Sequence, residues 1–470
     1  MADNKNFTVE KIVNICGGKL VIGNPETVIT KYVHDTRTIE QGDMFVGVIG
    51  DNFNGSEYYK EALDKGAIGC ILENVSIEQD VLEKYSNRNI IIVEDTVLAL
   101  QKLAKQKRDL YNIPVVAVTG SVGKTSTKDI IASVLEQEYN VLKTEGNFNN
   151  HIGLPLTILR LKEHDAMVIE MGMNHFGEIR VLTNIAKPTI GVITNIGTAH
   201  IGILGSRENI LKAKLEMLEG ISNTGTIIIN NDNDLLHNWN KEKNDNIKVK
   251  TVGINNKSDY EAKNISTGVD GSTFDIKYKE ENIKVEVPIG GEHFVYNSLI
   301  GICVSDILGE DKDKAVKGIK EFKLTKRRME ILKTKKEITF INDTYNASYD
   351  SMKPAIEYLK NAEGLRKIAV LGDMLELGDY AEELHEKVGE EVAKNKIDIL
   401  ITVGELAKSI EKKAHEKGLN TSQIIHYANS EEATNGLKEI LQPGDLVLLK
   451  ASNLMKLYKI AEELAELYNK

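Results

Sequence analysis

Cysteine is scarce in this sequence, and its three copies, Cys16, Cys70 and Cys303, lie far apart with no Cys-x-x-Cys pair. This spacing argues against a disulfide framework and a thiolate zinc site, and it is typical of a reducing cytoplasm. Long apolar runs are also missing. No stretch approaches the roughly 20 apolar residues that span a bilayer, and the start of the chain lacks the apolar core of a signal peptide. We therefore expect a cytoplasmic protein without a membrane span.

Positive charge is in short supply as well. The chain has 59 lysines and arginines against 70 aspartates and glutamates, which gives a net charge of −11. A nonspecific nucleic-acid binder carries the opposite excess, so we expect no nucleic-acid partner. A phosphate site must then be a small positive island in an acidic protein. The length of 470 residues predicts about three domains, and an apolar fraction of 41% suffices for their cores.

One stretch has the order of a phosphate-binding loop: a buried strand over 115–119, a glycine turn, and a helix indicated by apolar residues at helical spacing from Ile130 onward. The turn has the sequence Thr119-Gly120-Ser121-Val122-Gly123-Lys124-Thr125-Ser126. Glycines let backbone N–H groups approach phosphate oxygens, Lys124 supplies a charge for the β- and γ-phosphates, and Thr125 supplies a hydroxyl for Mg²⁺.

The glycine spacing departs from the general pattern. Only two residues separate Gly120 from Gly123, where four are usual, and Val118 stands at the earlier glycine position. An ordinary glycine turn before a helix is the alternative. We expect ATP or a related nucleotide as the ligand because a strand and a helix flank the loop.

Polar residues follow other predicted strands, where the ligand crevice of an open α/β sheet lies. The strand Ala166–Glu170 ends in a carboxylate, so Glu170 is a candidate Mg²⁺ ligand. His200 follows the strand predicted over 190–195, but a lone histidine is more often structural than a ligand. The loop 145–153 contains Asn149 and Asn150, amides that suit a polar ligand or a simple turn.

Lys214 lies in the apolar face of the helix predicted over 207–218. At about 100° per residue it falls between Ile210 and Leu218, whereas Lys212 and Glu216 fall on the opposite face. Such a lysine snorkels to solvent, meets an anion or, as a neutral amine near a metal, adds CO₂ to form a carbamate ligand. The residues alone do not choose among these three.

The first segment has two polar clusters, His34-Asp35-Thr36-Arg37 and the turn 50–55 with Asn54 and Gly55. A guanidinium suits a phosphate, but solvated turns explain both clusters equally well. Asn297 precedes the helix predicted over 298–308 and either meets a base or only begins the helix. From residue 327 onward, strands and helices alternate as in a parallel, doubly wound sheet, and Asp343, Asn346 and Lys450 follow strands.

Taken together, these residues resemble the Mur ligase family over essentially the whole chain. The most specific matches are 119–125, 146–153, Asn342-Asp343-Thr344-Tyr345-Asn346-Ala347 with Asp350-Ser351-Met352, and 372–378 with His385. The short glycine spacing is itself a family feature. The resemblance implies an α/β protein of three domains. These are a UDP-sugar-binding domain (1–112), a central P-loop mononucleotide-binding domain for ATP (113–326) and a C-terminal Rossmann-like domain that closes on ATP and binds a dipeptide (327–470).

The resemblance is strongest to the branch that completes the peptidoglycan precursor. It implies an ATP-dependent ligase, active as a monomer, that joins D-alanyl-D-alanine to UDP-N-acetylmuramoyl-tripeptide through an acyl phosphate, with two Mg²⁺ ions. Implied catalytic and metal-binding residues are Lys124, Thr125, Glu170, His200 and carbamylated Lys214. Implied nucleotide contacts are 119–126, Asn297, Arg328, Asp343 and Asn346. Implied substrate contacts are Asp35, Thr36, Arg37, Asn54, Gly55, Asn149, Asn150 and Lys450.

Two departures from the family pattern matter. Lys450-Ala451-Ser452-Asn453 stands where the family usually has Lys-Gly-Ser-Arg, which removes a bidentate carboxylate binder from the dipeptide site. The usual histidine after the turn 52–55 is also missing. A sister ligase or folylpolyglutamate-type ligase with another amine substrate, and a nucleotide-switched binding protein, therefore remain alternatives. The third residue of the stem peptide, diaminopimelate or lysine, also stays open.

Overall fold

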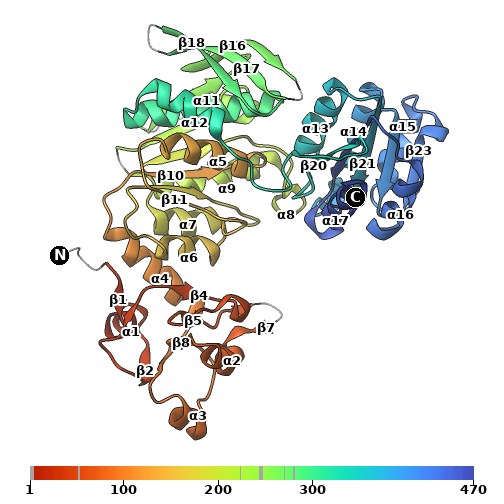
Figure 1. Cartoon of the computed structure of the whole chain (residues 1–470). Coiled ribbons are helices and arrows are strands. Elements are labelled where there is room, and N and C mark those ends of the chain that lie inside the picture. The colour runs from red at the N-terminus through yellow and green to blue at the C-terminus, as the bar shows by residue number, and fades with distance from the viewer. Residues whose placement is uncertain are drawn as a thin grey trace.

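The computed structural model describes residues 5–50, 53–222, 224–242, 247–268, 270–278 and 281–469. Three lobes follow one another along the chain, each with its own sheet, and the third lobe lies to one side of the second (Figure 1). The chain start and Asn52 of the predicted turn fall outside the described residues. All three cysteines are buried free thiols. Within the described ranges, no helix has the length and apolar content needed to cross a membrane.

The first lobe is built on a five-stranded sheet. Thr8 caps the first helix by accepting a hydrogen bond from the Lys11 N–H at 3.2 Å, and Gly17 ends it in the left-handed conformation at φ 72°. The sheet order is β2 (Lys19–Ile22), β9 (Asn89–Ile92), β8 (Gly69–Leu72), β5 (Met44–Val46) and β4 (Tyr32–Val33). The short strands are β1 (Phe7–Thr8), β3 (Val28–Ile29), β6 (Ile49–Gly50) and β7 (Phe53–Asn54); the helices are α1 (Val9–Cys16), α2 (Tyr59–Asp64), α3 (Gln79–Lys84) and α4 (Thr96–Asp109).

The second lobe is built on a nine-stranded sheet whose first seven strands are parallel. The order is β11 (Val141–Lys143), β12 (Ala166–Glu170), β10 (Val115–Thr119), β13 (Ile190–Ile193), β14 (Thr226–Asn230), β15 (Lys248–Gly253), β16 (Tyr260–Thr267), β17 (Ser272–Tyr278) and β18 (Glu281–Val287). Its helices are α5 (Lys124–Leu135), α6 (Gly153–Leu159), α7 (Glu178–Ala186), α8 (Ile201–Leu204), α9 (Arg207–Leu215), α10 (Asp234–Glu242), α11 (Glu292–Leu308) and α12 (Lys312–Glu321).

This order decides where a ligand binds. Strand β10 is fully buried, as its apolar run predicted, and it lies between β12 and β13. Because the three strands are parallel, the glycine turn, Glu170 and the segment after Ile193 meet at one edge of the sheet.

The third lobe has the predicted doubly wound sheet, parallel except for its first strand. The order is β19 (Glu330–Lys333), β20 (Thr339–Asn342), β24 (Asp445–Lys450), β21 (Arg366–Gly372), β22 (Ile399–Val403) and β23 (Ile424–Tyr427). Both faces are covered: Ile368 and Val370 pack in one core with α16 (Ser430–Ile440) and α17 (Tyr458–Asn469). Ala369 and Leu371 face the core of α13 (Tyr349–Asn361), α14 (Ala381–Lys394) and α15 (Lys408–Glu416).

Two predicted helices differ from the structure. Helix α11 begins at Glu292 instead of 298, so Asn297 lies inside the helix and does not begin it. Its first turns are polar because His293, Tyr296 and Asn297 line a cavity. The α-helix predicted over 207–218 ends at Leu215 and continues as a 3₁₀ turn. Glu216 there is buried, because its carboxylate accepts the backbone N–H of Gly177 at 2.8 Å, before α7.

Candidate active site

A cavity of about 500 Å³ opens at the carboxyl ends of β10, β12 and β13, and the third lobe forms its opposite wall. Fourteen of the predicted site residues line it: Ser121, Val122, Gly123, Lys124, Ser126, Asn149, Asn150, Glu170, His200, Asn297, Arg328, Asp343, Asn346 and Lys450. Four predicted residues of the second lobe do not line the cavity: Thr119, Gly120, Thr125 and Lys214. The structure therefore brings residues more than 300 positions apart into one place.

The turn before α5 is held by two residues that follow β13. The backbone N–H groups of Ser121 and Val122 donate to the backbone and side-chain oxygens of Asn195, at 3.1 and 2.9 Å. The Thr194 hydroxyl donates to the Val122 carbonyl at 2.6 Å. A Cβ atom on Gly120 would lie 1.9 Å from that hydroxyl oxygen, which explains the glycine. Since two of the loop amides are engaged, the groups that suit an anion are the free N–H groups in the first turn of α5.

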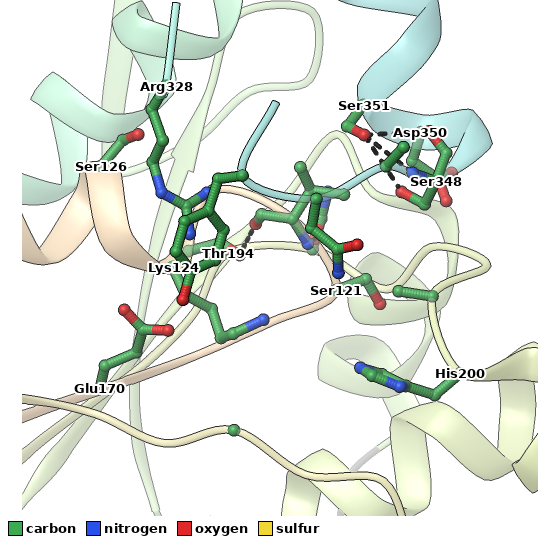
Figure 2. Close-up of a pocket in the computed structure, with 18 of the residues that line it drawn as sticks. Ser121, Lys124, Ser126, Glu170, Thr194, His200, Arg328, Ser348, Asp350 and Ser351 are labelled. Atoms are coloured by element: carbon green, nitrogen blue, oxygen red, sulfur yellow. Dashed lines mark hydrogen bonds between the residues drawn. The ribbon is translucent and has the colours of Figure 1, made fainter. Parts of the chain in front are cut away.

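Lys124 and Arg328 form the expected positive island. Figure 2 shows the Lys124 side chain between Arg328 and Glu170, with its Nζ donating to the Gly120 carbonyl at 3.0 Å. Burial lowers the pKa of Lys124, the Glu170 carboxylate raises it and the Arg328 guanidinium lowers it. Arg328 stacks on Tyr345, 4.0 Å from the ring centroid, and its buried Nε has no hydrogen-bond partner in the described parts of the chain. A buried cation with an unpaired donor is costly, so these two side chains suit an anionic ligand.

Glu170 and Thr125, both predicted as Mg²⁺ ligands, lie side by side. The Thr125 hydroxyl donates to Oε2 of Glu170 at 2.7 Å, and Nδ2 of Asn149 donates to Oε1 at 2.7 Å. Arg328 Nη2 donates to the Thr125 oxygen at 2.7 Å. Among the residues that the structure describes, no three His, Cys, Asp or Glu side chains gather as a metal cluster. Thr125 and Glu170 therefore suit a Mg²⁺ ion that takes its remaining ligands from phosphate and water.

Lys214 is buried, with 2% of its surface exposed. Snorkelling is therefore wrong for this lysine, because the side chain does not reach solvent. Within the described part of the chain, no hydrogen-bond or ion-pair partner faces its Nζ. Burial lowers the pKa of Lys214 well below its ordinary value, and the nearby Lys124 charge lowers it further. A neutral amine is the form that this environment favours.

His200 and Lys214 are not joined by any hydrogen bond in the described residues. His200 adopts a left-handed backbone at φ 66°, and its Nδ1 lies 2.9 Å from Oε2 of Glu376 in the third lobe. The contact is not aligned as a hydrogen bond. Glu376 is also left-handed, at φ 64°. Two such non-glycine residues in contact indicate strain that the surrounding structure maintains, which is common at functional sites.

Asn297 has one satisfied and one unsatisfied polar group. Its Oδ1 accepts the Thr127 hydroxyl at 2.9 Å, while its Nδ2 is buried without an acceptor. In the third lobe, Lys450 donates to Oδ2 of Asp343 at 2.5 Å and to the Asn346 carbonyl at 3.1 Å. Lys450 is buried by these contacts, so its ammonium group is already paired.

The first-lobe residues are not brought to the cavity. Arg37 forms a bidentate pair with Asp35, and these hydrogen bonds lower the pKa of Asp35 to about 2. Thr36 donates to Oε1 of Glu61 at 2.9 Å. Asn54 accepts the Ser56 N–H at 3.0 Å, and Gly55 packs so tightly on the Val48 carbonyl that a Cβ atom would lie 2.2 Å from it.

Sequence reasoning gave no role to Thr194 and Asn195, although the polar pair after β13 was a weak signal, because parallel strand ends converge. Asp350 and Glu376 lie within the family-like stretches 350–352 and 372–378, but no role was predicted for either. Their partners lie more than 150 residues away in sequence, a distance that no local pattern spans.

Comparisons with known proteins agree with this geometry. The Mur ligase middle domain matches residues 118–305, and the domain described as Mur ligase, glutamate ligase domain matches residues 327–453. The UDP-N-acetylmuramoyl-tripeptide–D-alanyl-D-alanine ligase of Bacillus subtilis is 39% identical over 98% of each chain.

Solved structures show the same architecture. MurF from Acinetobacter baumannii has a TM-score of 0.87 at 28% identity, covering 98% of this chain and 99% of that one. The MurF ligase of Thermotoga maritima in complex with ADP has a TM-score of 0.79 at 28% identity, covering 93% and 97%. On full-length likeness in sequence and fold, this chain belongs to the Mur ligase family.

Proposed function

We propose that this protein is an ATP-dependent amide ligase of peptidoglycan precursor synthesis. It joins D-alanyl-D-alanine to UDP-N-acetylmuramoyl-tripeptide and gives UDP-N-acetylmuramoyl-pentapeptide, ADP and phosphate. One observation carries the proposal: at the N-terminus of α5, Lys124 and Arg328 lie beside the hydrogen-bonded pair of Thr125 and Glu170. The name of the full-length Bacillus subtilis relative supports the choice of substrates.

The cavity has groups that fit ATP at both ends. The amides of the first turn of α5, Lys124 and Arg328 suit the phosphates, and the unpaired Nδ2 of Asn297 suits an acceptor nitrogen of the adenine ring. We assign the nucleotide site to residues 119–126, Asn297, Arg328, Asp343 and Asn346. When bound, ATP and Mg²⁺ supply a transferable phosphoryl group and neutralise its developing charge.

For the metal ions we assign Thr125 and Glu170 to one site, and His200 with carbamylated Lys214 to a second. The support for carbamylation is the environment of Lys214: a buried amine without a partner, disfavoured as a cation, is the form that adds CO₂. The carbamate would turn a repelled cation into an anionic oxygen ligand, which suits Mg²⁺.

For the substrates we assign Asp35, Thr36, Arg37, Asn54 and Gly55 to the uridine diphosphate end. Asn149, Asn150 and Lys450 are assigned nearer the reacting groups. Because Lys450 is already paired with Asp343, its contribution is to hold the third-lobe wall, unless substrate displaces that carboxylate.

The reaction requires the protein to neutralise developing charge and to align the reacting groups. The tripeptide carboxylate oxygen bonds to the γ-phosphorus as the bond to ADP breaks, and Lys124 and Arg328 lie where this charge gathers. The dipeptide amine then bonds to the acyl carbon, phosphate leaves with the former carboxylate oxygen, and the amine loses a proton. Closing the cavity against water protects the acyl phosphate from hydrolysis.

We further propose domain limits of 1–112, 113–326 and 327–470, a monomeric protein, and work in the cytoplasm. The limits follow the three sheets, which span residues 19–92, 115–287 and 330–450. Three buried free thiols support a reducing compartment.

The test is ATP-dependent phosphate release with Mg²⁺ and both substrates, with each then omitted in turn and the product identified by mass. We expect release only with both substrates, and a pentapeptide product. Release that needs neither substrate would overturn the ligase proposal in favour of a nucleotide-switched protein.

One observation favours a second candidate, a sister ligase with another amine. Asn453 replaces the usual arginine, and its Nδ2 donates to the Tyr345 carbonyl at 3.1 Å, so it offers no cation to a dipeptide carboxylate. A screen of amino acids and dipeptides in the same assay separates the two candidates, because only the sister ligase would prefer an amine other than D-alanyl-D-alanine.

A further inference from the structure

Residues 194–200, here called the bridging strip, connect the phosphate-binding turn with the third lobe. The strip leaves the carboxyl end of β13 and ends at α8, and Figure 1 shows α8 on the side of the second lobe that faces the third. Hydrogen bonds hold the side of the strip that faces the phosphate-binding turn. Besides the contacts of Thr194 and Asn195, the Gly197 N–H donates to the Ser121 hydroxyl oxygen at 2.9 Å. Ser121 lines the cavity, so this contact orients a cavity hydroxyl.

Two further contacts with described residues of the second lobe hold the strip. The Thr194 N–H donates to the Thr119 carbonyl at 3.0 Å. The Ile196 carbonyl accepts Nη2 of Arg207 at 2.8 Å and Nδ2 of Asn233 at 3.0 Å. Arg207 is itself fixed by a bidentate pair with Asp234. The following residues, Thr198 to His200, take their side-chain partners from the third lobe.

The main contact from the third lobe is Asp350, on α13. Its Oδ2 accepts both the backbone N–H of Thr198 at 2.6 Å and the Thr198 hydroxyl at 2.7 Å. The fit is tight, because a Cβ atom on Gly197 would lie 2.4 Å from the same oxygen. Asp350, Ser121 and His200 stand around one side of the cavity in Figure 2. The Asp350 carboxylate thus binds the strip at Thr198. This residue lies between Gly197, which orients Ser121, and His200.

We propose that Asp350 is a positioning residue, which acts from the third lobe through Thr198 to hold the bridging strip and thereby aligns Ser121 and His200 with the reacting phosphate. The expected effect of Asp350 on turnover rests on the proposed function. A second consequence does not rest on it: without Asp350, the strip loses its main anchor to the third lobe even in the protein without ligands.

A different role for Asp350 is direct binding of the incoming ammonium group, since Oδ1 has no partner among the described residues. The observed geometry favours positioning, because two donors from one residue converge on Oδ2 and no room is left at Gly197. The two roles differ in what they need. Positioning needs an acceptor oxygen, which Asn provides, whereas ammonium binding needs the charge.

The experiment compares Asp350→Asn, Asp350→Ala and Thr198→Val with wild type. Glu363→Ala is the control, because it removes an exposed carboxylate of the same lobe. We expect kcat to fall about 100-fold in Asp350→Ala, the scale of a 1 Å misplacement, with little change in KM for the dipeptide. Asp350→Asn should stay within about tenfold of wild type, since it keeps a weaker, neutral acceptor. In the Thr198→Val background, Asp350→Ala should cost much less, because the shared contact is already weakened.

Hydrogen exchange of the peptide covering 196–204, in protein without ligands, gives the second measurement. We expect this peptide to exchange faster in Asp350→Ala than in wild type. In Asp350→Asn and Glu363→Ala it should exchange at the wild-type rate. If Asp350→Asn lowered kcat as much as Asp350→Ala and also raised KM for the dipeptide, the positioning role would be overturned in favour of ammonium binding. Unchanged exchange and kcat in Asp350→Ala would refute any role. An inactive wild type, by contrast, would contradict the proposed function and leave the exchange result to decide this inference.

Discussion

At the scale of single residues, Lys124 is the side chain that turnover should need and folding should not. Among the described residues, the hydrogen bond of its side chain goes to the Gly120 carbonyl alone, so removal of the side chain costs the fold little. We expect Lys124→Ala to lower kcat by at least about 100- to 1000-fold, the scale of removing one group that stabilises developing charge. The thermal midpoint should not fall. Lys143→Ala, which removes a half-buried lysine paired with Glu136 away from the cavity, is the control, and near-normal turnover in a folded Lys124→Ala protein would refute the phosphate role.

Lys214 makes a separate prediction, because its proposed role depends on CO₂. Lys214→Ala should lose activity, and short carboxylates such as acetate or formate should partly restore it by entering the space of the carbamate. Mass spectrometry of the intact wild-type protein gives no reliable signal for so labile a group, so the rescue in the turnover assay is the measurement. Full activity of Lys214→Ala without added carboxylate would contradict carbamylation.

Glu310 carries a pH-dependent cost to stability. It is 5% exposed, and neither of its buried carboxylate oxygens has a hydrogen-bond partner among the described residues. Burial raises its pKa from 4.5 to about 7. Because the folded state holds this proton more tightly than the unfolded state, the stability it provides is present below pH 4.5 and is lost as the pH rises through 7.

The substitution Glu310→Gln removes the loss of stability at high pH, because glutamine does not ionise. We expect the free energy of unfolding to increase by about 2–3 kcal/mol at pH 8, and the difference from wild type to vanish near pH 4. Urea unfolding from pH 4 to 8 measures it, with Glu363→Gln as the exposed control. An equal shift at both ends of this range would show that the effect is not titration.

At the scale of elements, the sequence predicted what depends on local pattern. Strand β10 and helix α5 lie where the apolar spacing and the glycine turn predicted them. It misplaced the start of α11, because the polar residues there face a cavity that only the folded chain creates. It also could not foresee that Lys450 pairs with Asp343, since that contact joins strands 107 residues apart.

The short helix α8 gives the prediction at this scale. A Cβ atom on Gly202 would lie 2.5 Å from the Gly378 nitrogen and 2.5 Å from the Leu377 carbonyl carbon, both backbone atoms of the third lobe. Gly202→Ala must therefore displace that lobe. We expect a larger radius of gyration by small-angle scattering and a lower kcat. Gly268→Ala is the control, because its nearest new contact is an ordinary 3.9 Å, and equal behaviour of the two variants would contradict the interface.

At the scale of the whole molecule, three sheets are arranged so that one cavity takes residues from two lobes. The linker is fixed to the second lobe, because Asp129 on α5 accepts the Thr325 hydroxyl at 2.8 Å, just before Arg328 reaches Thr125. The first-lobe cluster at Arg37 does not line this cavity. The fold class followed from the alternation of elements, but the joining of the lobes follows only from contacts across them.

In the proposed reaction, the tripeptide carboxylate is phosphorylated before the amide forms. The direct measurement uses UDP-N-acetylmuramoyl-tripeptide with ¹⁸O in its terminal carboxylate, together with ATP, Mg²⁺ and D-alanyl-D-alanine, and determines the mass of the released phosphate. Because phosphate leaves with the former carboxylate oxygen, we predict one ¹⁸O atom in each phosphate formed. Phosphate without ¹⁸O, released at the rate of amide formation, would contradict the account.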